Sequence, residues 1–209
     1  IAPITESNID EVLEQGCWTP VVRTSLDANE KAELYAEQLS EDGSHFKVLQ
    51  HGVVKREVLW NMTGQHSVAN ALATIAAAEH VGVSIATACE ALSNFGGVKR
   101  RMELLGTVRG IEVYDDFAHH PTAIDTTLEG ARKRLGERKL WAIIEPRSNT
   151  MRMGSHKEGL AHSARLADAV IWYQPEGLDW DLQPVINAAP NKAKIARTLD
   201  DIIQTVVAE

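Results

Sequence analysis

The sequence predicts an α/β protein made of two parts that join near Gly96 and Gly97. Three observations support this fold class. Before the junction, short runs rich in Val, Leu, Phe and Trp precede an Ala-rich stretch whose apolar residues recur three and four positions apart. At the junction, Phe95-Gly96-Gly97 interrupts the helical pattern. After it, strand-like and helix-like segments alternate, which indicates a mostly parallel sheet with helices on both faces.

The first part begins with a short helix and a small sheet. Ser7 is expected to cap the helix at its start and Gly16 at its end. Residues 34–60 predict an antiparallel meander, because turn-forming residues at 40–43 and 51–52 separate three short apolar runs. Two helices are expected to follow. The Ala-rich stretch 66–80 has the strongest helical pattern, and Ser84 can cap a second helix that ends near residue 93.

The second part alternates strands with helices. The expected strands are residues 111–114, 140–144, 169–173 and 193–195, and the expected helices are 122–135, 156–166, 182–188 and 199–207. These strands are expected to form the parallel sheet.

The composition sets limits on the class of protein. The chain of 209 residues is 44% apolar, which is enough for buried cores without disulfides. A formal net charge of −8 argues against a general nucleic-acid-binding or anionic-membrane surface, although a local cluster can still bind an anionic small molecule. No apolar run approaches the roughly 18 to 20 residues of a membrane span. We therefore expect a cytoplasmic protein.

Two further features concern the whole chain. Cys17 and Cys89 are far apart and lack metal-site spacing, so we expect thiols in a reducing compartment and no disulfide. The chain opens without Met and ends just after a helical pattern that has no stop signal. We expect both ends to be cut from a longer protein.

Four clusters of polar residues could carry chemistry. The first, Gly64 to Asn70, begins the Ala-rich helix, where exposed N–H groups carry partial positive charge. His66 and Asn70 are four residues apart on one face, so they could hydrogen-bond a ligand such as a purine edge. The alternative is that both side chains cap the helix locally.

The second cluster places Lys99, Arg100 and Arg101 directly after the glycine pair. An Arg at a domain junction suits a phosphate that both domains contact, because its guanidinium donates two parallel hydrogen bonds. A solvated basic turn is the alternative.

The third cluster contains Asp115, Asp116, His119 and His120, directly after a strand-like run. The carboxyl ends of strands in α/β sheets commonly bind ligands. The carboxylates could accept hydrogen bonds from ribose hydroxyls, and the imidazoles could face a phosphate or a substrate carboxylate. We interpret the two carboxylates as ribose contacts rather than as a proton-transfer pair.

The fourth cluster, residues 145–154, follows the predicted strand 140–144 and reads Glu-Pro-Arg-Ser-Asn-Thr-Met-Arg-Met-Gly. Its charge and its hydrogen-bond donors suit an acidic substrate. The donors are Arg147, Ser148, Asn149 and Arg152. A plain connecting loop is the alternative, although this loop is long and cationic.

Several common motifs are absent from the sequence, namely the G-x-x-x-x-G-K-[ST] phosphate loop, G-x-G-x-x-G, G-x-S-x-G, H-E-x-x-H and paired C-x-x-C. Without a phosphate loop, these residues alone are not expected to cradle a triphosphate in the usual way. A complete nucleotide-dependent enzyme would need more protein.

Together, the order and spacing of the four clusters resemble the Mur ligases, the ATP-dependent amide-forming enzymes of peptidoglycan synthesis. Gly64 to Asn70 is similar to the family's G-x-H-N-x-x-N helix start, and Arg101-Met102-Glu103 to its R-x-E element. Asp115 to Thr122 is similar to D-D-[YF]-x-H-H-P-T. Residues 145–154 are most similar to the branch of the family that acts in peptidoglycan recycling.

The resemblance implies a fold for each part. Residues 1–96 would be the second part of a central ATP-binding domain, and residues 97–209 most of a C-terminal Rossmann-like domain that brings the acceptor peptide. The phosphate loop, the magnesium-binding residues and a modified lysine would precede this chain, so no metal ligand is expected within it. A final strand and helix would follow it.

The resemblance also implies a reaction. An ATP-dependent ligase of the recycling branch, with Mg²⁺, joins the tripeptide L-Ala-γ-D-Glu-meso-diaminopimelate to UDP-N-acetylmuramate through an acyl phosphate. Two alternatives stay open: the branch that adds L-alanine to the same nucleotide sugar, and a module that binds ligand without catalysis. By itself, the chain is expected to be inactive.

The nucleotide would be bound by residues of the first three clusters. By the resemblance, His66 and Asn70 would contact adenine, and Asp115 or Asp116 would hold the ribose. Arg101 would bridge phosphate across the domain junction, as both an ATP-binding and a catalytic residue.

The remaining roles concern the reacting centre and the acceptor. His119 and His120 would be catalytic residues that face the reacting centre. The acidic peptide would be oriented by Arg147, Ser148, Asn149 and Arg152. Ser67 stands where the family commonly has Asn, so a contact made by that Asn would be lost or remade by a shorter hydroxyl.

Overall fold

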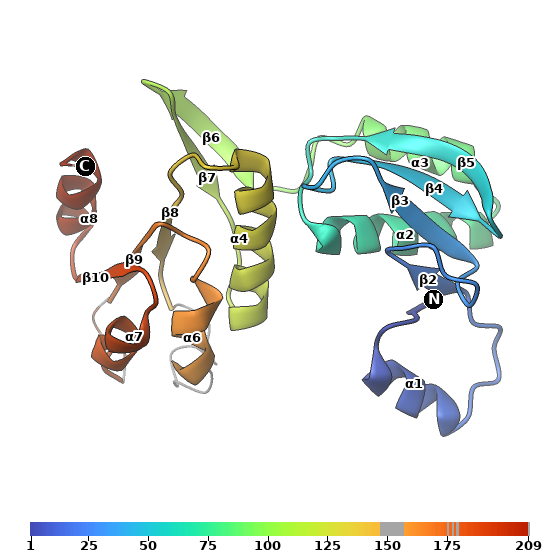
Figure 1. Ribbon diagram of the computed structural model, residues 1–209, viewed down its shortest axis with the longest axis horizontal. Coiled ribbons are helices and arrows are strands. Elements are labelled where there is room, and N and C mark those ends of the chain that lie inside the picture. Colours follow the sequence, from blue (N-terminus) through green and yellow to red (C-terminus); the bar gives the residue numbers. More distant parts are fainter. Residues whose placement is uncertain (147–156, 175, 177, 179, 209) are drawn as a thin grey trace. The chain divides into compact units, whose positions relative to one another are not determined.

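The chain folds into two compact units. A computed structural model describes residues 1–146, 157–174, 176, 178 and 180–208. Unit 1 is Ile1–Val98 and unit 2 is Lys99–Glu209 (Figure 1). The predicted junction, at residues 96 and 97, lies just before this division. The roles that the resemblance assigns to the two parts remain predictions.

Unit 1 contains a five-stranded sheet in the order β1-β2-β3-β4-β5. Its strands are β1 (Ala2–Pro3), β2 (Arg23–Ser25), β3 (Leu34–Gln38), β4 (His45–Gln50) and β5 (Val53–Leu59). β3, β4 and β5 pair antiparallel, which confirms the meander predicted for residues 34–60. β1 and β2 run parallel to their neighbours. The sequence does not predict them, because strands this short show no pattern.

The helices of unit 1 are α1 (Ser7–Glu14), α2 (Gln65–His80) and α3 (Ile85–Ser93). The prediction that Ser7 caps the first helix is wrong, because Glu6 is the capping residue and Ser7 already lies in the helix. The prediction for Ser84 is confirmed, since its side chain accepts a hydrogen bond from the Thr87 N–H. α2 and α3 pack against the sheet (Figure 1), and the core between them includes Phe46, Val48, Leu72, Ile75 and Cys89.

The two cysteines are free and lie in different surroundings. Burial raises the pKa of the Cys89 thiol to about 11, whereas hydrogen bonding to Thr19 lowers the pKa of the exposed Cys17 thiol. Because the thiolate is the reactive form, iodoacetamide at about pH 7.5 should alkylate Cys17 in the native protein and Cys89 only after unfolding. Mass spectrometry of the two cysteine peptides checks this order. Equal labelling rates in the native protein would contradict it.

Unit 2 contains a three-stranded parallel sheet in the order β10-β9-β8. Its strands are β8 (Trp141–Ile144), β9 (Ala169–Tyr173) and β10 (Lys192–Ala196). The α/β class and the parallel sheet that the alternating segments predict are therefore confirmed.

The segment 111–114 does not pair with that sheet, which corrects the prediction. It forms β7 (Ile111–Asp115), which pairs antiparallel with β6 (Glu103–Val108). Arg109 and Gly110 join the two strands with φ angles of 52° and 81°. Left-handed residues at both turn positions favour a two-residue hairpin turn, and strands joined so closely run antiparallel.

The helices described in unit 2 are α4 (Pro121–Leu135), α6 (Lys157–Ser163), α7 (Gln183–Ala188) and α8 (Leu199–Val207). Side chains of α4, α6 and α7 form a core with Val170 and Trp172 of β9, which lie on one face of the parallel sheet. Thr198 and Asp201 form a capping box at the start of α8. None of the helices in the described ranges is long and apolar enough to cross a bilayer.

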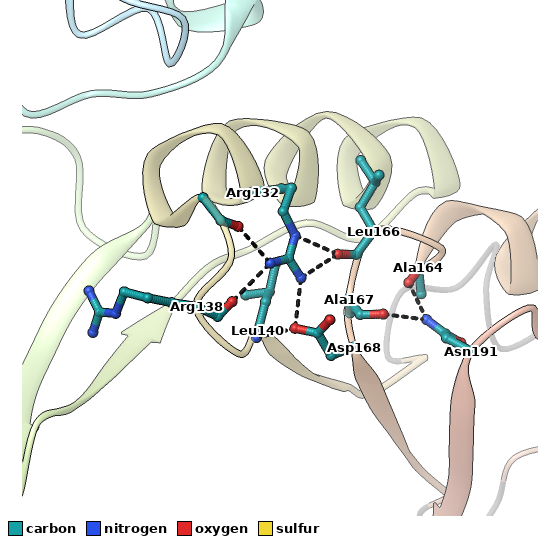
Figure 2. Close-up of polar contacts among 9 residues, drawn as sticks. Arg132, Arg138, Leu140, Ala164, Leu166, Ala167, Asp168 and Asn191 are labelled. Atoms are coloured by element: carbon teal, nitrogen blue, oxygen red, sulfur yellow. Dashed lines mark hydrogen bonds and ion pairs between the residues drawn. The ribbon is translucent and has the colours of Figure 1, made fainter.

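Arg132 ties the last turn of α4 to the neighbouring loops (Figure 2). All five of its N–H donors are used, over 2.8 to 3.1 Å, and the acceptors are the carbonyl oxygens of Gly136, Arg138 and Leu166 and a carboxylate oxygen of Asp168. The same oxygen of Asp168 accepts a 2.7 Å bond from the Leu140 N–H, just before β8. Arg132 therefore fixes the start of β8 against the loop that precedes β9.

Asn191 holds the other side of that loop. Its Nδ2 donates to the carbonyl oxygens of Ala164 and Ala167, at 2.7 and 2.9 Å (Figure 2). Asn191 directly precedes β10. The connection from α6 to β9 is thus bonded from both of its flanks.

Candidate functional site

The start of α2 carries the first predicted cluster, in unit 1. The helix begins after Gly64, which has a φ of 86° and caps the helix without a side-chain bond. His66 and Asn70 are both exposed on the first turns of α2. Neither side chain makes the cap, so the alternative that they serve as local caps is not supported. Their exposure leaves this helix face accessible to a ligand.

Ser67 differs from these two neighbours because it is buried, with 3% of its surface exposed. Its hydroxyl donates a 2.7 Å hydrogen bond to the carbonyl oxygen of Thr63. The Ser67 side chain thus points into unit 1 and supplies a hydrogen-bond donor to a backbone carbonyl that precedes the helix. The hydroxyl is therefore engaged within unit 1.

The second cluster lies at the start of unit 2 and has an unusual backbone. Arg100 and Met102 have φ angles of 60° and 47°, in the left-handed region that side chains disfavour. Three hydrogen bonds hold this backbone. The Arg100 N–H donates to Glu103 Oε2 at 2.8 Å, the Phe117 N–H donates to the Arg100 carbonyl at 2.8 Å, and the Met102 N–H donates to a carboxylate oxygen of Asp116 at 2.9 Å.

The paired carboxylates of the third cluster have different environments. Asp116 uses both oxygens within the unit: Oδ2 accepts from Met102, and Oδ1 accepts from the Ala118 N–H at 2.8 Å and the Thr127 hydroxyl at 3.5 Å. Asp115 Oδ2 pairs with Arg100 Nε at 3.2 Å. Asp116 therefore acts as a tie between backbone segments, whereas Asp115 faces an exposed guanidinium.

Phe117 lies at the centre of this cluster. The Cζ atoms of Arg100 and Arg101 lie 5.1 and 5.8 Å from its ring centroid. The His119 ring is 5.2 Å from the same centroid, with an interplanar angle of 52°. The structure thus brings Arg100, Arg101 and His119 together around one aromatic ring, and Asp115 joins this group through its pair with Arg100.

The two histidines are held through different ring chemistry. His119 Nδ1 lies 3.2 Å from the Phe117 carbonyl, and since a carbonyl only accepts, this Nδ1 carries the proton. His120 Nδ1 accepts a 3.2 Å bond from the Thr122 N–H at the start of α4, so this Nδ1 is unprotonated. These tautomers are assigned from the bonding partners. In the neutral state, Nε2 of His119 is an acceptor and Nε2 of His120 is a donor.

The fourth cluster is described only at its first residues. Glu145 and Pro146 follow the carboxyl end of β8. The peptide-binding predictions lie outside the described residues, and they are Arg147, Ser148, Asn149 and Arg152. Among the residues that the structure does describe, no group of three or more His, Cys, Asp or Glu side chains is placed to hold a metal ion.

Sequence reasoning missed three parts of the unit 2 cluster. Phe117 occupies the aromatic position of the D-D-[YF] motif and could have been found from it. Arg100 adjoins Arg101, but nothing in the sequence marks its pairing with Asp115. Thr127 lies within α4, and only the fold brings its hydroxyl to Asp116.

Comparison with known proteins gives a consistent family. A model of the Mur ligase, glutamate ligase domain, matches residues 100–209, which is more than half of the chain. A Haemophilus influenzae protein, UDP-N-acetylmuramate–L-alanyl-γ-D-glutamyl-meso-2,6-diaminoheptandioate ligase, is 43% identical over 100% of this chain and 46% of its own length. The crystal structure of a murein peptide ligase from Psychrobacter arcticus has a TM-score of 0.70 and 49% identity, over 98% of this chain and 44% of that one.

A more distant relative belongs to the alternative branch. The UDP-N-acetylmuramate–L-alanine ligase of Desulfitobacterium hafniense is 37% identical over 73% of this chain and 34% of its own length. The chain spans less than half the length of each of these relatives. On the matched family model and the two motif clusters of unit 2, the chain belongs to the Mur ligase family.

Proposed function

We propose that the complete protein is an ATP-dependent ligase that joins the tripeptide L-Ala-γ-D-Glu-meso-diaminopimelate to UDP-N-acetylmuramate. The observation that carries this proposal is the 43% identity, along the whole chain, to a relative named for that tripeptide. The L-alanine ligase from Desulfitobacterium hafniense matches a smaller part of the chain, at 37% identity. An amide-forming reaction also agrees with the exposed cations and imidazoles of unit 2.

The reaction has two bond-forming steps. The lactyl carboxylate of UDP-N-acetylmuramate attacks the γ-phosphorus of ATP, which gives an acyl phosphate and releases ADP. The α-amine of the tripeptide then attacks the acyl carbon, and the tetrahedral intermediate collapses to the amide and phosphate. Cationic groups must offset the charge that develops on the phosphate and on the oxyanion.

The residues of unit 2 fit these requirements. Arg101 binds the transferred phosphate, because its guanidinium is exposed and next to a second one. Asp115 holds the ribose, since Asp116 has both oxygens engaged within the unit. His119 Nε2 accepts the proton that the attacking amine loses, and His120 Nε2 donates a hydrogen bond toward the reacting oxygens.

The other roles involve unit 1 and the acceptor loop. His66 and Asn70 contact adenine from the exposed start of α2. The loop after β8 orients the acidic peptide through Arg147, Ser148, Asn149 and Arg152. Mg²⁺, when bound, spreads phosphate charge, but no cluster in the described ranges fits it, and we assign its ligands to none of these residues.

The proposal is tested by an acceptor comparison in the complete protein. With ATP, Mg²⁺ and UDP-N-acetylmuramate present, kcat/KM for the tripeptide should exceed that for L-alanine by about a hundredfold or more, because only the tripeptide carries the distal carboxylates. ADP release and product mass are measured together. A preference for L-alanine would assign the protein to the alternative branch. If neither the tripeptide nor L-alanine gave ADP release, the protein would be a module that binds ligand without catalysis.

A further inference from the structure

Phe117 is an exposed aromatic residue whose ring is not explained by core packing. Its side chain is 48% exposed, and it belongs to neither hydrophobic core of the described residues. Single exposed apolar side chains are common, so exposure alone assigns the ring no role. The contacts of its ring with charged groups are therefore the features that need an explanation.

Those contacts gather groups that would otherwise repel one another. Two guanidinium carbons lie 5.1 and 5.8 Å from the ring centroid, within the range in which an aromatic face attracts a cation. Asp115 partly balances Arg100 through their 3.2 Å pair. The Arg101 guanidinium carbon lies 5.8 Å from the centroid of the Phe117 ring, so the ring is a neighbour that can stabilise its charge.

The backbone of Phe117 reinforces this arrangement. Its N–H donates to the Arg100 carbonyl at 2.8 Å, and its own carbonyl accepts from His119 Nδ1 at 3.2 Å. The ring and the main chain of a single residue thus contact both neighbouring segments. A change in the ring alone would leave these backbone bonds in place, which makes the contribution of the ring separable.

We propose that Phe117 is a positioning residue: its ring holds the Arg101 guanidinium beside Arg100 and His119, so that the group assigned to the phosphate and the group assigned to the amine proton keep a fixed arrangement. This inference rests on the proposed function. The ring touches no reacting atom and acts through the two arginines. Its contribution depends on the negative charge of the aromatic face, and not only on its volume.

The test replaces Phe117 in the complete protein with 4-fluoro-, 3,5-difluoro- and 3,4,5-trifluorophenylalanine. Fluorine withdraws charge from the face while the shape of the ring changes little. We expect kcat to fall at each step, to about a fifth of wild type for the trifluoro ring, and Phe117→Leu to lower it about tenfold. The tripeptide KM should stay within about twofold, and Phe117→Tyr, which keeps an aromatic face, should keep kcat near the wild-type value. The same fluorinated residues at Phe95, which is 42% exposed in unit 1, provide the matched control.

A second measurement separates this proposal from the proposed function. In the 209-residue chain, the Arg101 Hε resonance should be shifted upfield by the Phe117 ring current, and Phe117→Leu should remove the shift. ADP release combined with a flat fluorine series, or an absent ring-current shift, overturns the role of Phe117. If the ring-current shift is present in the 209-residue chain but the complete protein releases no ADP with any acceptor, the proposed function is overturned. The phosphate role of Arg101 is then overturned as well.

Discussion

Replacing Arg132 by Leu is expected to lower the free energy of unfolding of unit 2 by about 2 to 4 kcal/mol. The variant removes all five N–H donors at once (Figure 2). It leaves three carbonyl oxygens and the Asp168 carboxylate without that partner. Because the Arg132 side chain is only 24% exposed, water replaces these bonds incompletely. Urea unfolding, with hydrogen exchange of the β8 and β9 amides to assign the loss to unit 2, measures the effect.

The neighbouring Lys133 is the matched control on the same helix. It pairs with Glu129 one turn earlier, at 2.7 Å. A pair of this kind is worth little, so Lys133→Leu should change the free energy of unfolding by less than about 0.5 kcal/mol. Equal effects of the two substitutions would show that the Arg132 bonds add nothing beyond helix propensity.

Asp168 adds a pH signature to the Arg132 variant. The hydrogen bond from Arg132, and then the bond from the Leu140 N–H, lower the pKa of Asp168 below its ordinary 3.8. A carboxyl with a lowered folded pKa adds stability above its unfolded pKa and loses it as pH falls through the folded value. The difference between wild type and Arg132→Leu should therefore shrink below about pH 4. Since Asp168 is 49% exposed, solvent screening keeps this part of the difference small.

Replacing Arg101 by Ala in the complete protein should lower kcat by about a hundredfold to a thousandfold at saturating ATP, UDP-N-acetylmuramate and tripeptide. In the proposed reaction, the guanidinium offsets charge that develops on the transferred phosphate. Arg101→Lys keeps the charge but not the paired donors, and it should recover only part of the rate. The rate of ADP release gives kcat for the wild type, Arg101→Ala and Arg101→Lys.

Arg197 is the control for Arg101, because it is an exposed Arg of the same unit that follows β10. Arg197→Ala should keep the wild-type kcat. Both variants should unfold at the wild-type temperature, since both side chains are exposed. Wild-type turnover by Arg101→Ala at saturating substrates would remove Arg101 from the phosphate site.

The elements with long or repeated patterns are the ones that the sequence predicts well. The Ala-rich helix, the meander of residues 34–60 and the strand 169–173 all occur as expected. The hairpin partner of segment 111–114 is missed, because Gly106 interrupts the apolar run of β6 and a bulge shifts its register there. The error at Ser7 is a shift of one residue at a helix end, where sequence signals are weakest.

For the site, residue types are predictable but partners are not. The sequence identifies Asp115 and Asp116 as a pair, yet only the fold shows that Asp116 bonds Met102, Ala118 and Thr127. The Ala118 bond spans two residues and is typical of an Asp turn, whereas Met102 and Thr127 are 14 and 11 residues away and no spacing rule links them to Asp116. Ser67 shows the same limit: a polar residue in a ligand-like motif points into the core because the preceding carbonyl needs a donor.

The left-handed residues on either side of Arg101 have a consequence for ligand binding. Each such residue costs about 1 to 2 kcal/mol of conformational energy. The hydrogen bonds that Glu103 and Asp116 accept, and the one that the Phe117 N–H donates, offset that cost inside unit 2. The main chain that carries Arg101 is therefore ordered when the unit folds, and a ligand is not needed to order it. Because this segment is already ordered, the free energy of ligand binding does not include the entropic cost of ordering it. Gly at position 100 or 102 would remove the backbone strain there, and its greater conformational freedom would let the main chain at Arg101 adopt more orientations.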